Sequence, residues 1–196
     1  MEWYRVVKFL HILTVVFMAA PLYNLIVVNE RARFGRAPYQ VDLYFESLIR
    51  GNSTRCYVFQ LTALVTGLLL LPLGGISFGT LVANWVLLAK LILLFALMGL
   101  LSIVHFGLQP RIDTLLAQVK EEAGTPIPQE VAGQIAPLRV RRKRLAGTCL
   151  FLVIATILLG LQVFARFNPI VTVILMGLAA LFAWKVYRTP IPYGWV

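Results

Sequence analysis

Cysteines and acidic side chains are scarce in this chain of 196 residues. Its two cysteines, Cys56 and Cys149, exclude the disulfide framework that holds small secreted domains together. Only 8 residues are acidic whereas 18 are basic, so the net charge is +10. The sequence also contains no phosphate-binding loop, nucleophile triad or cysteine-rich metal motif. It therefore lacks the short motifs by which the common soluble enzyme classes are recognised.

Long apolar runs are the most prominent feature of the sequence. Hydrophobic residues make up 60% of the chain and its mean hydropathy is +0.83, which is too apolar for a soluble domain of this length. Five runs are long enough to cross a bilayer, at about 4–29, 56–73, 85–108, 145–166 and 170–187. We predict an all-α integral membrane helical bundle, a single transmembrane domain over residues 1–196 with a four-helix core and one further helix. The alternative is four spans, with the last two runs forming a hairpin that does not cross.

The distribution of basic residues predicts the orientation of the chain. Fourteen of the 18 Lys and Arg residues lie in the connectors 30–55 and 109–144 or near the carboxyl terminus, whereas the connector 74–84 has no charge. The positive-inside rule then places the amino terminus outside and the carboxyl terminus in the cytoplasm, and we expect a multi-pass protein of the cell inner (cytoplasmic) membrane. Because topology accounts for the positive charge, we expect no nucleic-acid partner. We do expect protein partners, in a membrane complex or a homo-oligomer.

The second basic connector carries two further patterns. Apolar residues at helical spacing between Arg111 and Glu122 predict a short amphipathic helix on the membrane surface. The densest basic cluster follows, and we predict that it fixes the topology and contacts anionic lipid. It consists of Arg139, Arg141, Arg142, Lys143 and Arg144.

Three polar residues share one depth near the outer side of the predicted membrane. His11 lies about seven residues inside the first span, and Lys90 and Gln162 lie about as deep in the third and fourth spans, at ~1.5 Å per residue. Three cations lie just above this level, namely Arg5, Lys8 and Arg166. His105 lies near the inner end of the third span, about 22 Å from Lys90. The two histidines are therefore too far apart to bind one iron.

An ionisable side chain inside a membrane span is costly and points to a function. His11 has three possible uses: a haem or metal ligand, a proton relay, or a packing residue. We favour haem b, because its porphyrin is apolar while its two propionates require cations. Lys8, Arg5 and Arg166 are placed to supply these, with Gln162 as a further polar contact. Lys90 could pair with a propionate, ligate the iron when neutral, or extend to the interface.

Several short motifs resemble one family of small membrane proteins. The first span contains Val7–Leu13 (VKFLHIL), similar to the first helix of the HemJ-type protoporphyrinogen oxidases and of the related copper-resistance D-like and DUF2269-like groups. The third span contains Trp85–Leu91 (WVLLAKL), which resembles the W-x-x-x-K-L segment of the same group. Thr66-Gly67 fits its T-G-L pattern, and His105 with Gln109-Pro110-Arg111 resembles its charged helix end.

The resemblance covers about the first 120 residues and implies a four-helix membrane core that holds haem b. It implies that His11 is the axial ligand and that Lys90 is a required partner. We therefore expect a haem b-binding membrane protein in electron transfer, such as a small subunit of a respiratory or redox complex. The alternatives are a protoporphyrinogen IX oxidase-like enzyme and an accessory membrane subunit without a cofactor.

Overall fold

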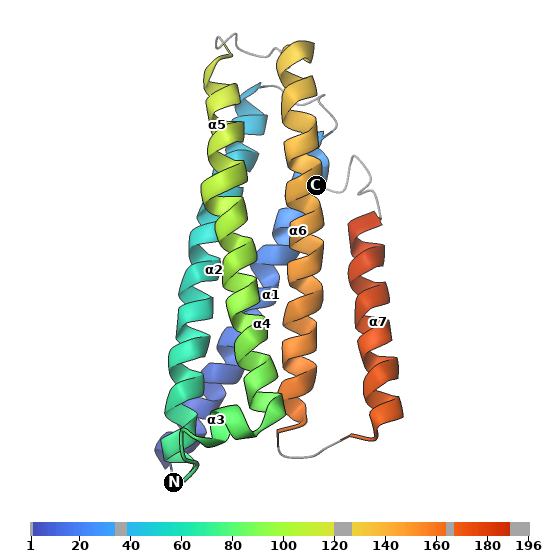
Figure 1. Cartoon of the computed structure of the whole chain (residues 1–196). Helices are drawn as coiled ribbons and strands as arrows, with labels where there is room; N and C mark the ends of the chain where they lie inside the picture. Colours follow the sequence, from blue (N-terminus) through green and yellow to red (C-terminus); the bar gives the residue numbers. More distant parts are fainter. Residues whose placement is uncertain (1, 34–38, 120–126, 164–166, 189–196) are drawn as a thin grey trace.

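The computed structural model describes residues 2–33, 39–119, 127–163 and 167–188 (Figure 1). Within these ranges the chain is helical almost throughout and contains no strand. The elements are α1 (Glu2–Arg33), α2 (Tyr39–Leu73), α3 (Thr80–Ala83), α4 (Trp85–Ser102), the π-helical turn η1 (Ile103–Leu108), α5 (Gln109–Ala117), α6 (Gln129–Leu161) and α7 (Pro169–Arg188). Five helical segments are long and apolar enough to cross a membrane. The predicted fold class is confirmed.

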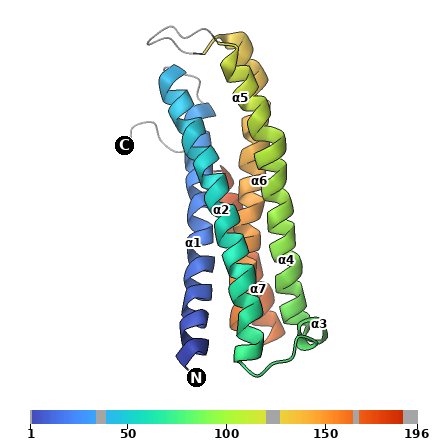
Figure 2. The same ribbon diagram turned by 90° about the vertical axis from the view of Figure 1, so that its left-hand side faces the viewer.

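Four of the long segments form the bundle and the fifth lies beside it. Helices α1, α2, α4 and α6 run side by side, and α7 packs against α6 (Figures 1 and 2). In its most apolar stretch α6 has half of its residues buried, whereas α7 has 11% buried. The small helix α3 lies at the end of the bundle where α1 begins, which we call the α3 end. The opposite end, where α5 lies, is called the basic end.

The buried faces of α2 and α6 follow an alternating spacing of three and four residues. In α2 these positions include Asp42, Glu46, Ile49, Ser53, Cys56, Gln60 and Ala63. In α6 they include Ile135, Arg139, Arg142, Ala146, Cys149, Val153 and Thr156. This is the spacing by which nearly parallel helices interlock their side chains. One continuous packing face therefore runs through the predicted membrane spans and beyond them.

The π-helical turn η1 keeps the third membrane segment in register with its neighbours. Leu101, Val104 and Leu108 are buried at the three-and-four spacing, which would next reach Arg111. Instead Arg111 is exposed and Ile112 is buried, one position later. A π-helical turn accommodates one additional residue within a helix. It therefore allows α5 to continue α4 while still presenting its apolar side to the bundle.

The helices extend far beyond the predicted spans at the basic end. Helix α2 has 35 residues and is about 52 Å long, whereas a bilayer core is about 30 Å thick. Residues 39–55, predicted as part of a connector, are therefore helical and continue the predicted span as one helix that is longer than the hydrocarbon core is thick. The amphipathic segment from Arg111 was predicted to lie on the membrane surface, and this prediction is wrong. Up to Ala117 it forms most of α5, whose residues Ile112 and Leu116 pack against α2 and α6.

Charged side chains are buried between α2, α5 and α6 at the basic end. We call this group the ionic cluster; it consists of Asp42, Glu46, Gln109, Arg139 and Arg142. The Arg142 guanidinium donates two hydrogen bonds to the Glu46 carboxylate, at 2.6 and 2.9 Å. Arg139 donates to Asp42 and, at 3.0 Å, to Glu46, while Gln109 donates to Glu46 at 2.9 Å. Every carboxylate in the cluster therefore has a cationic partner.

The ionic cluster lies outside the spans predicted from the sequence, and its electrostatics keep Glu46 ionised. Burial alone would raise the pKa of Glu46, but hydrogen bonds and charge from Arg142, with Arg139, lower it to about 2. Burial raises the pKa of Asp42, and the hydrogen bond from Arg139 opposes that shift. The cluster thus joins three helices around Glu46, which stays ionised at neutral pH.

The predicted lipid contact is wrong for two of the five basic residues concerned. Arg139 and Arg142 are 4% and 0% exposed and bind carboxylates, so neither side chain can reach a lipid headgroup. Lys143 is also buried, with its Nζ atom 5.1 Å from the centre of the Tyr187 ring. Arg141 and Arg144 are exposed, and their contact with anionic lipid stays a prediction.

Candidate functional site

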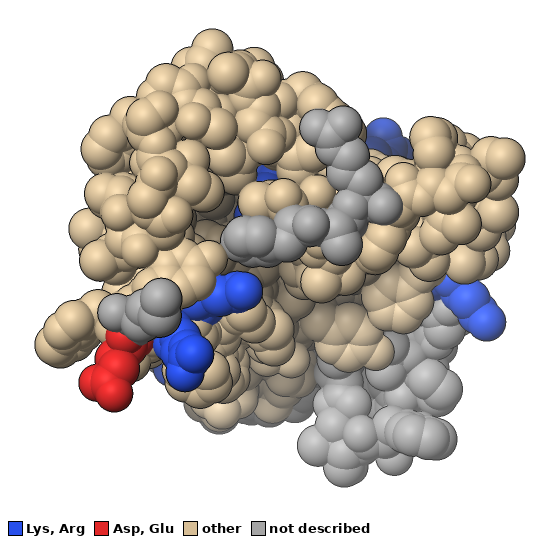
Figure 3. Space-filling model, turned by 90° about the horizontal axis from the view of Figure 1, so that it is seen from below, with Lys and Arg blue, Asp and Glu red and all other residues tan. Residues whose placement is uncertain are grey.

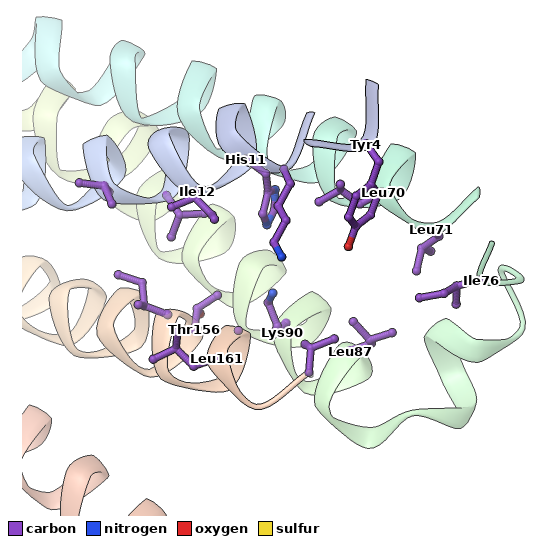
Figure 4. A pocket seen from close by; sticks show the side chains of 16 residues that line it. Tyr4, His11, Ile12, Leu70, Leu71, Ile76, Leu87, Lys90, Thr156 and Leu161 are labelled. Carbon is purple, nitrogen blue, oxygen red and sulfur yellow. The ribbon is translucent and has the colours of Figure 1, made fainter. Parts of the chain in front are cut away.

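A pocket of about 440 Å³ lies between the helices toward the α3 end. Its wall is formed by α1, α2, α4 and α6, together with residues that follow α2 and α6. The lining is mostly aliphatic, and its polar side chains are Tyr4, Lys8, His11, Lys90 and Thr156. Figure 4 shows His11 entering from α1 and Lys90 from α4, with both side chains directed into the same space. Two residues predicted to share one depth therefore face one pocket.

His11 is held by a hydrogen bond to helix α2. Its Nδ1 atom lies 2.9 Å from the hydroxyl oxygen of Thr66. The Thr66 hydroxyl donates its own proton to the carbonyl of Thr62, at 2.6 Å. Because that proton is used, the hydroxyl oxygen acts as acceptor and His11 Nδ1–H as donor. The imidazole lone pair is thereby assigned to Nε2, the arrangement found in histidines that ligate metals.

Two glycines give the pocket residues their space. A Cβ atom on Gly67 would lie 3.2 Å from Cε1 of His11, which is closer than an ordinary van der Waals contact. A Cβ atom on Gly160 would lie 3.4 Å from the Nζ atom of Lys90. Gly67 therefore lets the imidazole lie directly against α2, and Gly160 lets the Lys90 ammonium approach α6.

The described pocket lining contains basic side chains but no acidic ones. Lys8, His11 and Lys90 all line it, and none of the described lining residues is Asp or Glu. Lys8 also lies over the Tyr4 ring, with Nζ 5.9 Å from the ring centre. A charged side chain at such an apolar site costs about 2.5–3.5 kcal/mol on insertion scales. An anionic ligand would offset this cost.

Seen from the α3 end, the surface is mostly uncharged and basic atoms are visible inside a recess (Figure 3).

Two other predicted site residues are not brought into the pocket, and a third cannot be placed. Arg5 is exposed and does not line it. Gln162 is buried, but it is directed to α7, where its Oε1 atom accepts a 3.4 Å hydrogen bond from Thr172. Arg166 lies outside the described residues. Of the predicted cationic partners for a propionate, the structure brings Lys8 and Lys90 to the pocket.

His105 lies in η1, away from the pocket-lining residues. Its ring meets the Tyr57 ring edge-on, with ring centres 5.7 Å apart, and Tyr57 is hydrogen-bonded to Ser102 at 2.8 Å. Its buried Nδ1 atom has no hydrogen-bond partner among the described residues. His105 and His11 thus occupy separate environments, as their predicted depths required.

The residues that support His11 were not predicted as site residues. Thr66 and Gly67 appeared only as part of a short motif, and Tyr4 and Gly160 not at all. Thr66 and Gly67 could have been found from the sequence, because this T-G pair lies in the second predicted span at the same depth as His11. Among the described residues, no group of three or more His, Cys, Asp or Glu side chains is placed to hold a metal ion. A haem would need only one or two protein ligands, since the macrocycle supplies the rest.

Comparison with known proteins adds no relative to this description. The chain matches no family model, and the searches of curated proteins and of solved structures likewise give no match.

Proposed function

We propose that the pocket binds haem b and that the protein transfers electrons in the membrane. The observation that carries this proposal is the His11–Thr66 hydrogen bond, which assigns the imidazole lone pair to Nε2 inside an apolar pocket. Histidine is a common axial ligand of haem iron. A ligating histidine usually donates its other N–H to a fixed acceptor, as His11 does here.

The pocket residues fit the remaining parts of a haem. The volume of about 440 Å³ lies within the range of about 300–1,000 Å³ that is usual for ligand pockets. Aliphatic side chains such as Val15, Leu70 and Leu87 suit the porphyrin faces. Lys8 and Lys90 offer cations to the propionates, and Lys90 in its neutral form is an alternative second ligand. The absence of Asp and Glu from the described part of the lining favours a dianionic group over a cationic one.

The chain's own residues would orient the cofactor and exclude water from it. A bound haem b would supply one-electron redox chemistry. Thr66 fixes the imidazole tautomer, Gly67 fixes the distance of the ring from α2, and the aliphatic wall keeps the site dry. In the orientation predicted from the basic residues, the α3 end faces outward, so the pocket belongs to the outer half of the inner membrane. A small subunit of a respiratory or redox complex is the setting we propose.

The same cavity also suits a second candidate, oxidation of protoporphyrinogen IX. That substrate is an apolar tetrapyrrole with two carboxylates, so it matches the same combination of aliphatic walls and lysines. The two candidates differ in whether the tetrapyrrole stays bound. Purification with a stoichiometric pigment supports the electron-transfer protein, whereas turnover of added protoporphyrinogen supports the enzyme.

The test is an absorption spectrum of the purified protein, oxidised and reduced, after expression with added haem precursor. We expect a Soret band at one haem per chain. Lys90→Ala should shift or weaken that band without removing it, because the imidazole ligand remains. If the wild-type protein carries no Soret band, even when isolated with its native partners, the haem proposal fails. The accessory-subunit alternative would then replace it.

A further inference from the structure

The exposed part of the pocket wall is confined to two helices. Four of the lining side chains are exposed, at 53% for Ile12, 56% for Val16, 37% for Ile157 and 58% for Leu161. The first two belong to α1 and the last two to α6, and all are aliphatic. Among the described residues, all other lining side chains are buried or half-buried, including Tyr4 and Ile76 near the α3 end. The pocket therefore opens between α1 and α6.

Helices α1 and α6 separate toward the α3 end. Nearer the basic end they are in close contact, where Met18 and Leu22 of α1 are buried against Cys149 and Val153 of α6. One to two turns further toward the α3 end, the facing residues of both helices line the pocket instead of touching a buried core. Figure 4 places Ile12 and Leu161 on opposite sides of that space.

The opening lies at the depth of lipid hydrocarbon. Ile12 and Ile157 are each about 12–14 Å from the outer ends of their predicted spans, at ~1.5 Å per residue. Half of a bilayer core is about 15 Å thick. An aliphatic rim at this depth faces acyl chains, and water would not wet it.

We propose that this gap between α1 and α6 is a lateral entrance, through which an anionic amphiphile enters the pocket from the outer leaflet. The aliphatic rim passes an apolar body, and the cations of Lys8 and Lys90 inside receive a carboxylate. The identity of that ligand as a tetrapyrrole rests on the proposed function, but the entrance does not. A ligand already dissolved in the bilayer needs no passage past the half-buried residues at the α3 end.

The entrance can be tested with a diazirine-bearing fatty acid in vesicles that contain the full chain. After illumination, adducts are mapped by mass spectrometry. We expect label on Lys90 and on Thr156, which is only 8% exposed and lies within the pocket. Ile174 on α7, which is 56% exposed, reports label from bulk lipid in the same sample. Label on Ile174 without label on Lys90 or Thr156 would overturn the proposal.

Tryptophan variants distinguish entry of the ligand from the bilayer from its entry from water. Ile157→Trp and, independently, Leu161→Trp should cause loss of label from Lys90 and Thr156, while the matched α7 variant Ile174→Trp should not. If Ile76→Trp removes the interior label instead, the ligand enters from water and the proposal is wrong. Interior label in a protein without a Soret band would support the entrance and refute only the haem proposal.

Discussion

The Nδ1 atom of His11 lies 2.9 Å from the hydroxyl oxygen of Thr66, although the two residues are 55 positions apart in the chain. The Thr66 proton is itself donated to the Thr62 carbonyl, so the hydroxyl can only accept from the imidazole. This pair connects α1 to α2 within the pocket wall. It also selects which ring nitrogen of His11 is available to a ligand.

Thr66→Val should weaken haem binding by about 10–100-fold, the usual effect of removing the hydrogen-bond partner of a ligating histidine. Valine has nearly the shape of threonine but cannot accept the Nδ1–H bond. Haem titration of the apoprotein measures the change. Thr62→Val is the matched control, because Thr62 contributes only its backbone carbonyl to this arrangement. Equal affinity in Thr66→Val and wild type would contradict the role of the hydrogen bond.

His11→Ala should abolish the Soret band of the folded protein, since it removes the sole histidine in the pocket lining. His105→Ala should leave the band nearly intact, because His105 lies among Tyr57 and Phe106 and not in the pocket. Circular dichroism checks that both variants retain their helices. Haem stoichiometry must be measured alongside, because a second haem near His105 would also change the spectrum. Loss of a single haem in His105→Ala would show that the ligand assignment is wrong.

Gly67→Ala should displace the His11 ring by a few tenths of an ångström and so lower haem affinity, because the new methyl group would lie 3.2 Å from Cε1. Gly99→Ala, in α4, is the matched control, since a Cβ atom there meets nothing within 4 Å. We expect Gly99→Ala to leave the spectrum unchanged. Identical haem titrations of the two variants would argue against close packing of the imidazole on α2.

The sequence predicts the helical fold well because each apolar run is long enough to cross a bilayer and contains few charged residues. Depth alone also brings His11 and Lys90 together, since a helix converts residue number into distance along the membrane normal. It cannot reveal which face of a helix a side chain occupies relative to its neighbours. Gln162 has the same depth as His11 but faces α7, and this difference depends on how the helices are rotated.

The ionic cluster was missed for a different reason. Asp42 and Glu46 lie in a charged stretch, and charge alone favours a solvated connector over a packed helix. The feature that indicates a packed helix is the alternating spacing of three and four residues, which continues from Asp42 through Ser53 to Gln60 and so enters the predicted span. Arg139 and Arg142 share that spacing in α6. Complementary charges on two such faces predict pairing, but their partners are more than 90 residues apart.

Glu46→Gln should destabilise the protein by about 3–5 kcal/mol, because Arg142 and Arg139 would lose a buried anionic partner. The midpoint of denaturation in detergent measures this loss. Arg50→Ala is the control, because it breaks the Arg50–Asp113 pair, in which the Arg50 side chain is 59% exposed. That pair should contribute only about 0–1 kcal/mol. Similar losses in both variants would mean that burial of the cluster has no energetic consequence.

Acid should weaken the same cluster. Since the pKa of Glu46 falls from its ordinary 4.5 to about 2 on folding, its contribution to stability is complete above pH 4.5 and is lost as the pH falls toward 2. The pKa of Asp42 is raised by burial, so its protonation offsets part of that loss. The pH dependence should therefore be smaller in Glu46→Gln than in wild type. An unchanged dependence would contradict this assignment.

Gly79→Cys and Gly133→Cys should react with a membrane-impermeant maleimide from opposite sides of the membrane. Both positions are exposed, Gly79 before α3 and Gly133 near the start of α6. The native Cys56 and Cys149 are buried and should stay unlabelled. In intact cells we expect labelling at Gly79→Cys only, and in inverted vesicles at Gly133→Cys only. Labelling of both from one side would disprove the five-span topology.

Burial of Arg139 and Arg142 gives these residues a place in the packed bundle in addition to the role in topology predicted for them. In the orientation predicted from the basic residues, their positive charges would hold the start of the fourth span in the cytoplasm during insertion, and acidic residues contribute little to that effect. Because α1 and α2 precede α6 in the chain, Asp42 and Glu46 would be synthesised before their partners Arg139 and Arg142. The arrival of α6 neutralises these carboxylates. On that prediction, two of the residues that set the orientation of the protein end up buried at the basic end of the bundle.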